Sequence, residues 1–126
     1  MIIIDTDVLI EILDKGSEKG DEALGRIRQS GENISITAIN LHEILYGLQK
    51  YAKPVKEVLL LPVLNYTKKD ANTSARIELE AEHRGTPIGR TDSMIAAIAI
   101  NNSASLYTLN LKHFKPLETL GLKIFP

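Results

Sequence analysis

The sequence contains no cysteine and no tryptophan, and aromatic residues make up only 5% of its 126 residues. Without cysteine the chain can form no disulfide, no thiolate zinc site and no cysteine nucleophile. Any metal ion must therefore be bound by oxygen or imidazole ligands. The interior must be packed with aliphatic rather than aromatic side chains.

Long apolar runs are also missing. The longest one late in the chain, residues 94–100, is far shorter than the ~20 residues that span a bilayer. The three isoleucines at the start are interrupted by Asp5, a pattern that does not fit a signal peptide. We therefore expect a soluble cytoplasmic protein that does not enter a membrane.

Neither sign of charge dominates, since 15 basic and 16 acidic residues give a net charge of −1. A strongly basic surface is excluded, so any binding of nucleic acid requires a local patch or a bound cation. The length and an ordinary 44% of hydrophobic residues predict a single globular domain over residues 1–126.

Strand and helix signals alternate along the chain. The run Ile2–Ile4 is typical of a central strand of a parallel sheet, buried on both faces. Further strands are expected at 33–37, 62–66, 105–108 and 122–125. Helices are expected at about 8–13, 17–30, from the second strand to 51, 54–61, 68–84 and 91–101. This order predicts an α/β fold with a parallel sheet.

Two segments carry more specific expectations. The helix 17–30 has few apolar residues and contains Gly20 and Gly25, so it is expected to be peripheral and mobile. Residues 112–114 are expected to form only a short turn before the last strand.

Two carboxylates lie where ligands bind in open α/β sheets, beyond the carboxyl ends of the strands. Asp5 follows the first strand, and Asp92 lies in the first turn of the most apolar helix. Each also has a purely structural explanation. Asp5 or Thr6 can cap the first helix, and the dipole of the later helix favours an acid at its start.

Other polar residues are more ambiguous. Glu43 lies nearly opposite the apolar stripe of its helix, so periodicity alone predicts a solvated surface residue. Asn110 and His113 follow the fourth strand, where turn formation alone explains an asparagine. If Asp5, Glu43 and Asp92 converge, their repulsion favours a divalent cation. Oxygen ligands suit Mg²⁺ or Mn²⁺, which promote phosphodiester hydrolysis.

A family resemblance rests on a series of motifs in a fixed order. These are the segments 5–9 (DTDVL), 40–47 (NLHEILYG), 87–97 (PIGRTDSMIAA) and 108–110 (TLN), followed by Phe114. Together they resemble a PIN-domain ribonuclease of the VapC toxin type over essentially the whole chain. The resemblance implies a three-layer α/β/α sandwich with a central parallel sheet.

The resemblance also implies functional roles. Asp5 and Asp92 would be the main Mg²⁺ or Mn²⁺ ligands, and Glu43 would hold a metal-bound water or a second ion, against the periodicity argument. Asn110 stands with His113 where relatives often have a fourth acid, so it is a catalytic candidate that adds no charge. Further residues would hold these groups in place or orient them: Thr6, Asp7, Thr108 and His113.

The implied substrate is RNA, with Arg84, Arg90 and Lys112 as expected phosphate-binding residues. The implied partners are an antitoxin that blocks the cleft and a second copy of the chain in a homodimer. Leucine-rich segments around Leu48 and at 59–61 fit either a dimer face or the core.

Two other functions fit parts of the sequence. The apolar strand and Asp-x-Asp opening also match a haloacid-dehalogenase-type phosphatase with Asp5 as nucleophile, although no suitable later lysine or Asp-Asp pair follows. A PIN-like module that binds a metal or a partner without cleaving RNA is the second alternative, because one fold hosts many functions.

Overall fold

The computed structural model describes residues 1–126. Its strands are β1 (Ile2–Ile4), β2 (Ile34–Thr37), β3 (Val63–Leu64), β4 (Ser105–Tyr107) and β5 (Lys123–Ile124). Its helices are α1 (Thr6–Leu9), the π-helix η1 (Ile10–Lys15), α2 (Glu18–Ser30), α3 (Ala38–Lys50), α4 (Lys56–Leu59), α5 (Lys68–His83), α6 (Arg90–Asn101), α7 (Leu111–Phe114) and the 3-10 helix η2 (Lys115–Leu120).

The five strands form one parallel sheet in the order β3-β2-β1-β4-β5. β1 lies at the centre, where Ile3 pairs with Ser35 of β2 and with Leu106 of β4. The chain adds β2 and β3 on one side of β1 and later adds β4 and β5 on the other. The carboxyl ends of β1 and β4 therefore meet at the point where the strand order reverses, the usual place for a ligand crevice in such sheets.

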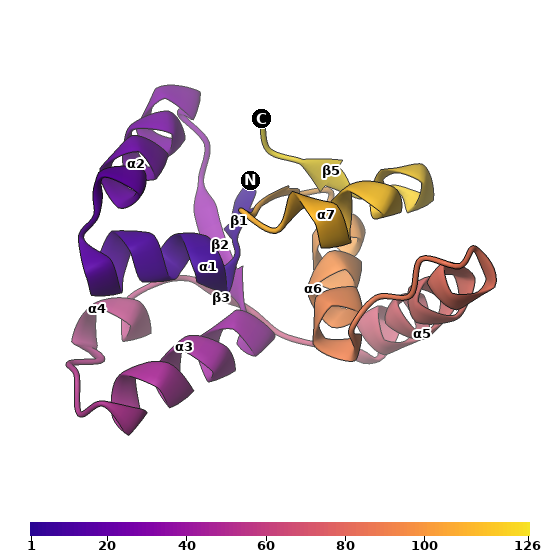
Figure 1. Cartoon of the computed structure of the whole chain (residues 1–126), viewed down its shortest axis with the longest axis horizontal. Coiled ribbons are helices and arrows are strands. Elements are labelled where there is room, and N and C mark those ends of the chain that lie inside the picture. Colours follow the sequence, from indigo (N-terminus) through magenta and orange to yellow (C-terminus); the bar gives the residue numbers. More distant parts are fainter.

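Helices cover both faces of the sheet, which confirms the expected three-layer arrangement (Figure 1). Ile2 and Ile4 pack into a core cluster with residues of α1 to α4, whereas Ile3 packs into a second cluster with α5 and α6. All three isoleucines are at most 2% exposed. The prediction that β1 is buried on both faces is correct.

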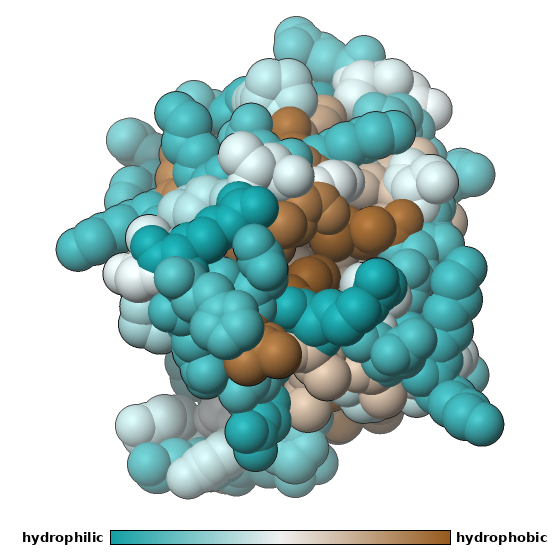
Figure 2. Space-filling model, turned by 90° about the vertical axis from the view of Figure 1, so that its right-hand side faces the viewer, coloured by the Kyte–Doolittle hydropathy of each residue, from teal (hydrophilic) through white to brown (hydrophobic).

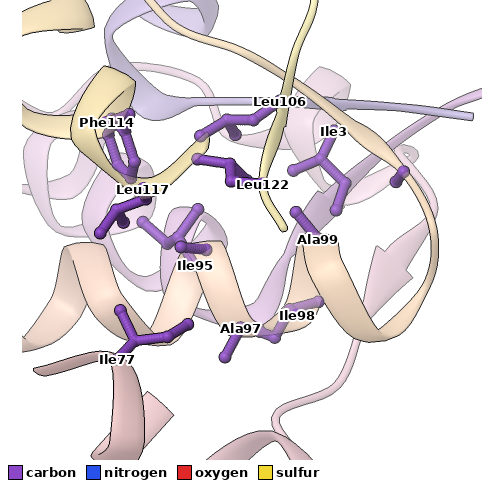
Figure 3. Close-up of a cluster of buried hydrophobic side chains, with 12 residues drawn as sticks. Ile3, Ile77, Ile95, Ala97, Ile98, Ala99, Leu106, Phe114, Leu117 and Leu122 are labelled. Carbon is purple, nitrogen blue, oxygen red and sulfur yellow. The ribbon is translucent and has the colours of Figure 1, made fainter. Parts of the chain in front are cut away.

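The helix α6 is the most deeply buried, as its alanine-rich sequence predicts. Its residues Ala96, Ala97 and Ala99 have no exposed surface, and their small side chains permit close packing on the sheet. Figure 3 shows Ile95 of this helix close to Leu117 and Phe114. α6 is thereby held with its N-terminus at the carboxyl edge of the sheet.

The segment 111–120 corrects the expected short turn. It forms α7 followed by η2, because Phe114 and Leu117 bury their side chains against the second core cluster at 0% and 2% exposure. Apolar residues recur here at every third position, from Leu111 to Leu120. That spacing matches the three residues per turn of a 3-10 helix.

The helix α2 corrects a second expectation. Gly20 is buried rather than a weak point of a peripheral helix, and a Cβ atom built on it would lie 2.2 Å from the carbonyl oxygen of Glu11. The glycine therefore permits a close approach between α2 and η1. Ala23 and Ile27 bury the same helix against the sheet.

The opposite side of the molecule, where α5 lies at the right of Figure 1, is shown in Figure 2. Hydrophilic side chains cover most of this face and surround an apolar area near its middle. No helix of the structure is both long enough and apolar enough to cross a bilayer.

The close approach at Gly20 predicts a strong effect of one methyl group. Gly20→Ala should lower the free energy of unfolding by at least about 2 kcal/mol, because backbone atoms of Glu11 cannot move aside cheaply. Gly25→Ala, in the exposed part of the same helix with nothing within 4 Å of its Cβ position, should raise it by about 0.5–1 kcal/mol. Urea denaturation of both variants tests the pair, and equal effects would contradict it.

Candidate active site

Asp5 is the centre of the site. It follows β1, is 7% exposed and caps α1 by accepting a hydrogen bond from the backbone N–H of Thr6 at 2.9 Å. The same carboxylate accepts the side-chain amide of Asn40 at 3.0 Å and the hydroxyl of Thr108 at 2.7 Å. The capping explanation and the functional one are thus both correct, because one buried carboxylate receives donors from α1, α3 and the end of β4.

Asn40 connects Asp5 to the start of α3. Its side-chain oxygen accepts from the backbone N–H and the hydroxyl of Thr37 in a capping box, and its amide donates to Asp5 and to the hydroxyl of Thr6. The two donor and two acceptor positions of the side chain are all used. Asn40 has no exposed surface, so it is locked in this orientation.

Glu43 lies one turn further along α3. It is exposed, as periodicity predicts, yet it accepts the hydroxyl of Thr6 at 2.7 Å. A surface position on the helix and a place beside Asp5 are therefore compatible. The conflict between periodicity and the family resemblance disappears, because the exposed side of α3 at this point is the wall of the cleft.

Asp7 approaches from the other side. Its Oδ2 accepts from the backbone N–H of Leu109 at 3.1 Å and lies 3.4 Å from the hydroxyl of Thr108. That hydroxyl has one proton, and the shorter contact to Asp5 receives it. The other oxygen of Asp7, Oδ1, is buried and has no hydrogen-bond partner.

Asp92, in the first turn of α6, forms the third side. Its Oδ2 lies 3.4 Å from Nδ1 of His113, which lies 2.8 Å from the amide nitrogen of Asn110. The backbone N–H of Asn110 donates to the hydroxyl of Thr108 at 3.0 Å. The residues at the family's fourth acidic position thus connect Asp92 to the same threonine that holds Asp5.

The carboxylates repel one another. Burial raises the pKa of Asp5 to about 6, and the nearby charges of Asp7 and Asp92 add to this effect against the hydrogen bonds from Thr108 and Thr6. Burial also raises the pKa of Asp7, although the backbone N–H of Leu109 partly opposes it. Negative charge is therefore concentrated at the sheet edge with no cation among its hydrogen-bond partners.

The arrangement has the donor types of a hard divalent-cation site, namely carboxylate oxygens and an amide. No three Asp, Glu or His side chains are grouped closely enough to hold an ion as they stand. Asp92 and Glu43 are the accessible members, at 25% for the Asp92 side chain and exposed for Glu43.

The three expected RNA-binding residues are placed differently from one another. Arg90 pairs through two nitrogens with Glu78 of α5, both at 3.2 Å. Arg84 contacts Glu80 at 3.0 Å and Thr119 at 2.6 Å. Lys112 has no ion pair and adjoins His113 at the cleft, so it is the best placed of the three to meet a phosphate.

Asn40 is the residue that sequence reasoning missed as part of the site, although it was a candidate cap for α3. A signal was present, because a buried capping asparagine has a free amide group that must find an acceptor. The strand order then makes Asp5 the nearest acceptor at the same sheet edge.

The family model of the PIN domain matches residues 2–116. The chain is 32% identical over 129 residues to "Ribonuclease VapC1" of Methanocaldococcus jannaschii, with 98% of this chain and 86% of the relative covered. It is 28% identical to "tRNA(fMet)-specific endonuclease VapC" of Salmonella typhimurium, covering 97% and 94%. The crystal structure of VapBC2 from Rickettsia felis bound to a promoter DNA fragment superposes with a TM-score of 0.80 at 26% identity, covering 100% of both chains.

Replacing the amide of Asn40 tests its part in the site. Asn40→Asp keeps the oxygen that caps α3 but puts a negative oxygen against Asp5, so the free energy of unfolding should fall by about 2 kcal/mol. Asn101→Asp is the matched control, because Asn101 donates to the buried Asp70 at 2.8 Å in another part of the molecule. Both should be destabilised in urea, but only Asn40→Asp should weaken stabilisation by Mn²⁺.

The raised pKa of Asp5 predicts how stability depends on pH in EDTA. Below about pH 4 this group is protonated in the folded and unfolded states, and the folded state pays nothing for burying it. As the pH rises to about 6 the unfolded chain ionises first, so the group's contribution is lost, by at most about 3 kcal/mol. The free energy of unfolding relative to Asp5→Asn should fall across this window. A constant difference would contradict the prediction.

Proposed function

The chain belongs to the PIN domain family, and from this membership we propose that it is an endoribonuclease that hydrolyses RNA phosphodiester bonds with the help of Mg²⁺ or Mn²⁺. The observation that carries the proposal is the carboxylate of Asp5, buried where the strand order reverses, with Asp7 and Asp92 close enough to raise its pKa. The relatives named ribonuclease support the reaction. The family match favours it over the phosphatase alternative.

The residues fit a divalent cation. The buried Oδ1 of Asp7 has no hydrogen-bond partner, and an oxygen of this kind is suited to a cation or to one of its waters. Asp5 and Asp92 would hold the ion, with Glu43 binding a metal water. Because Asp92 and Glu43 are accessible to solvent, their side chains can turn toward Asp5 when an ion enters.

A bound Mg²⁺ or Mn²⁺ supplies water activation and neutralises charge at the phosphate. The protein's own residues prepare the site. Asn40 and Thr108 hold both oxygens of Asp5 by hydrogen bonds of 3.0 and 2.7 Å, so that carboxylate keeps its orientation as the ion binds. Asn110 and His113 adjoin Asp92, where they can orient a water or accept its proton. Lys112 is placed to bind a substrate phosphate.

The biological role we propose is that of a toxin controlled by an antitoxin in the cytoplasm. The relative of known structure is a VapBC complex. On this chain Tyr46, Tyr51, Leu59 and Leu60 of the α3–α4 region are 54–77% exposed, an apolar surface typical of protein contacts. Leu48, at 7%, belongs to the core. We assign this surface to the antitoxin or to a second copy in a homodimer.

Cleavage of a labelled single-stranded RNA by the purified protein tests the proposal. Mn²⁺ or Mg²⁺ should support cutting and EDTA should abolish it. Asp92→Asn should lower the rate by at least about a hundredfold, because a metal ligand supports several kcal/mol of charge stabilisation. Asp21→Asn, on the exposed side of α2, should cleave at the normal rate.

A second readout separates binding from catalysis. Mn²⁺ should raise the melting temperature of the unmodified protein more than that of Asp92→Asn. Stabilisation by Mn²⁺ without cleavage of any RNA in a varied panel would overturn the nuclease proposal in favour of a binding module.

A further inference from the structure

A groove next to the acidic site is not used by the proposed chemistry. It has a volume of about 540 Å³, within the ~300–1,000 Å³ typical of ligand pockets. It lies between α2, the ends of β4 and β5, and the helices α7 and η2. We call it the Arg26 groove; the residues that matter most in it are Lys19, Arg26, Tyr107, Leu109, Lys115 and Phe125.

Arg26 forms the floor of this groove together with two rings. Its guanidinium carbon lies 5.5 Å from the ring centre of Tyr107 and 5.7 Å from that of Phe125. The two rings are themselves 4.9 Å apart. Because the residue is exposed while the rings support it from below, its planar group presents a flat and rigid surface to the groove.

The cations of the groove are free to bind an anion. Lys19, Arg26 and Lys115 take part in none of the ion pairs of the protein. Two acids, Glu22 and Glu118, also line the groove, so it is moderately rather than strongly basic. A flat guanidinium between two free lysines suits a planar group flanked by negative charges.

The groove is continuous with the acidic site. Thr108 and Leu109 line it, and these are the residues whose hydroxyl and backbone N–H bind Asp5 and Asp7. A polymer held at the carboxylates can therefore extend directly into the groove.

We propose that the Arg26 groove binds a nucleotide of the RNA strand next to the bond that is cut, with its base stacked on Arg26 and its phosphates near Lys19 and Lys115. Single-stranded RNA is recognised by stacking on aromatic and arginine planes and by such cations. The proposal rests on the nuclease function and adds to it the surface that selects single-stranded substrate. An acidic peptide would use the charges but would leave the flat surface without a partner.

Anisotropy of a short labelled single-stranded RNA in EDTA measures binding without cleavage. Arg26→Gln should raise the dissociation constant about tenfold, since stacking of one base contributes on this scale. Arg26→Lys keeps the charge but loses the plane, so it should still weaken binding at least about threefold. Arg28→Gln is the matched control, because Arg28 is exposed on the same helix and does not line the groove; its dissociation constant should not change.

Two further measurements separate stacking from charge. An abasic oligomer of the same length should bind the unmodified protein and Arg26→Gln about equally. The double change Lys19→Gln and Lys115→Gln should reduce the slope of log K against log salt by about one. Thermal unfolding of each variant checks that it is folded.

The outcomes are distinct. If RNA is cleaved normally by Arg26→Gln and bound as tightly as by the unmodified protein, the groove proposal is overturned while the nuclease function stands. Competition by polyglutamate that equals that of RNA would assign the groove to acidic peptides instead. If no RNA is cut although binding depends on Arg26, the nuclease proposal fails and the groove remains an RNA site.

Discussion

Burying a carboxylate at the end of a central strand costs several kcal/mol unless hydrogen bonds are directed at it, and Asp5 requires three. The donors come from Thr6, Asn40 and Thr108, residues that follow β1, β2 and β4. Because these strands are neighbours in the sheet, the requirements of one buried group bring their carboxyl ends into fixed register. The site is assembled by the same bonds that stabilise this edge of the sheet.

Asn40 shows how closely local structure and site are connected. Its oxygen completes the capping box that begins α3, and its amide holds Asp5. The direction of α3 is set by this cap, and Glu43 one turn later is thereby brought to Thr6 at 2.7 Å. A residue 37 positions from Thr6 in the sequence thus enters the site through helix capping and not through a contact of its own with the core.

The fold was predictable because its signals are local. Three isoleucines at the start and the alanine-rich α6 are nearly unexposed, and hydrophobic patterning of this kind does not depend on distant contacts. The acidic residues were predictable at a coarser level, since strand ends in a parallel sheet share one edge. Pairing was not: the contact of Arg90 with Glu78 and that of Asp92 with His113 depend on how α5 and α7 pack, which no spacing in the sequence encodes.

Gly20 illustrates what propensity cannot show. A glycine in a helix lowers intrinsic stability, yet here it lets α2 approach the carbonyl of Glu11 to a distance that a Cβ atom would prevent. That approach fixes how α2 lies over the sheet, and two turns further on Arg26 meets the rings of Tyr107 and Phe125. The apparent weakness of the helix is therefore what positions its cation. A substitution that pushes α2 outward must alter the stability of the fold and the shape of the Arg26 groove together.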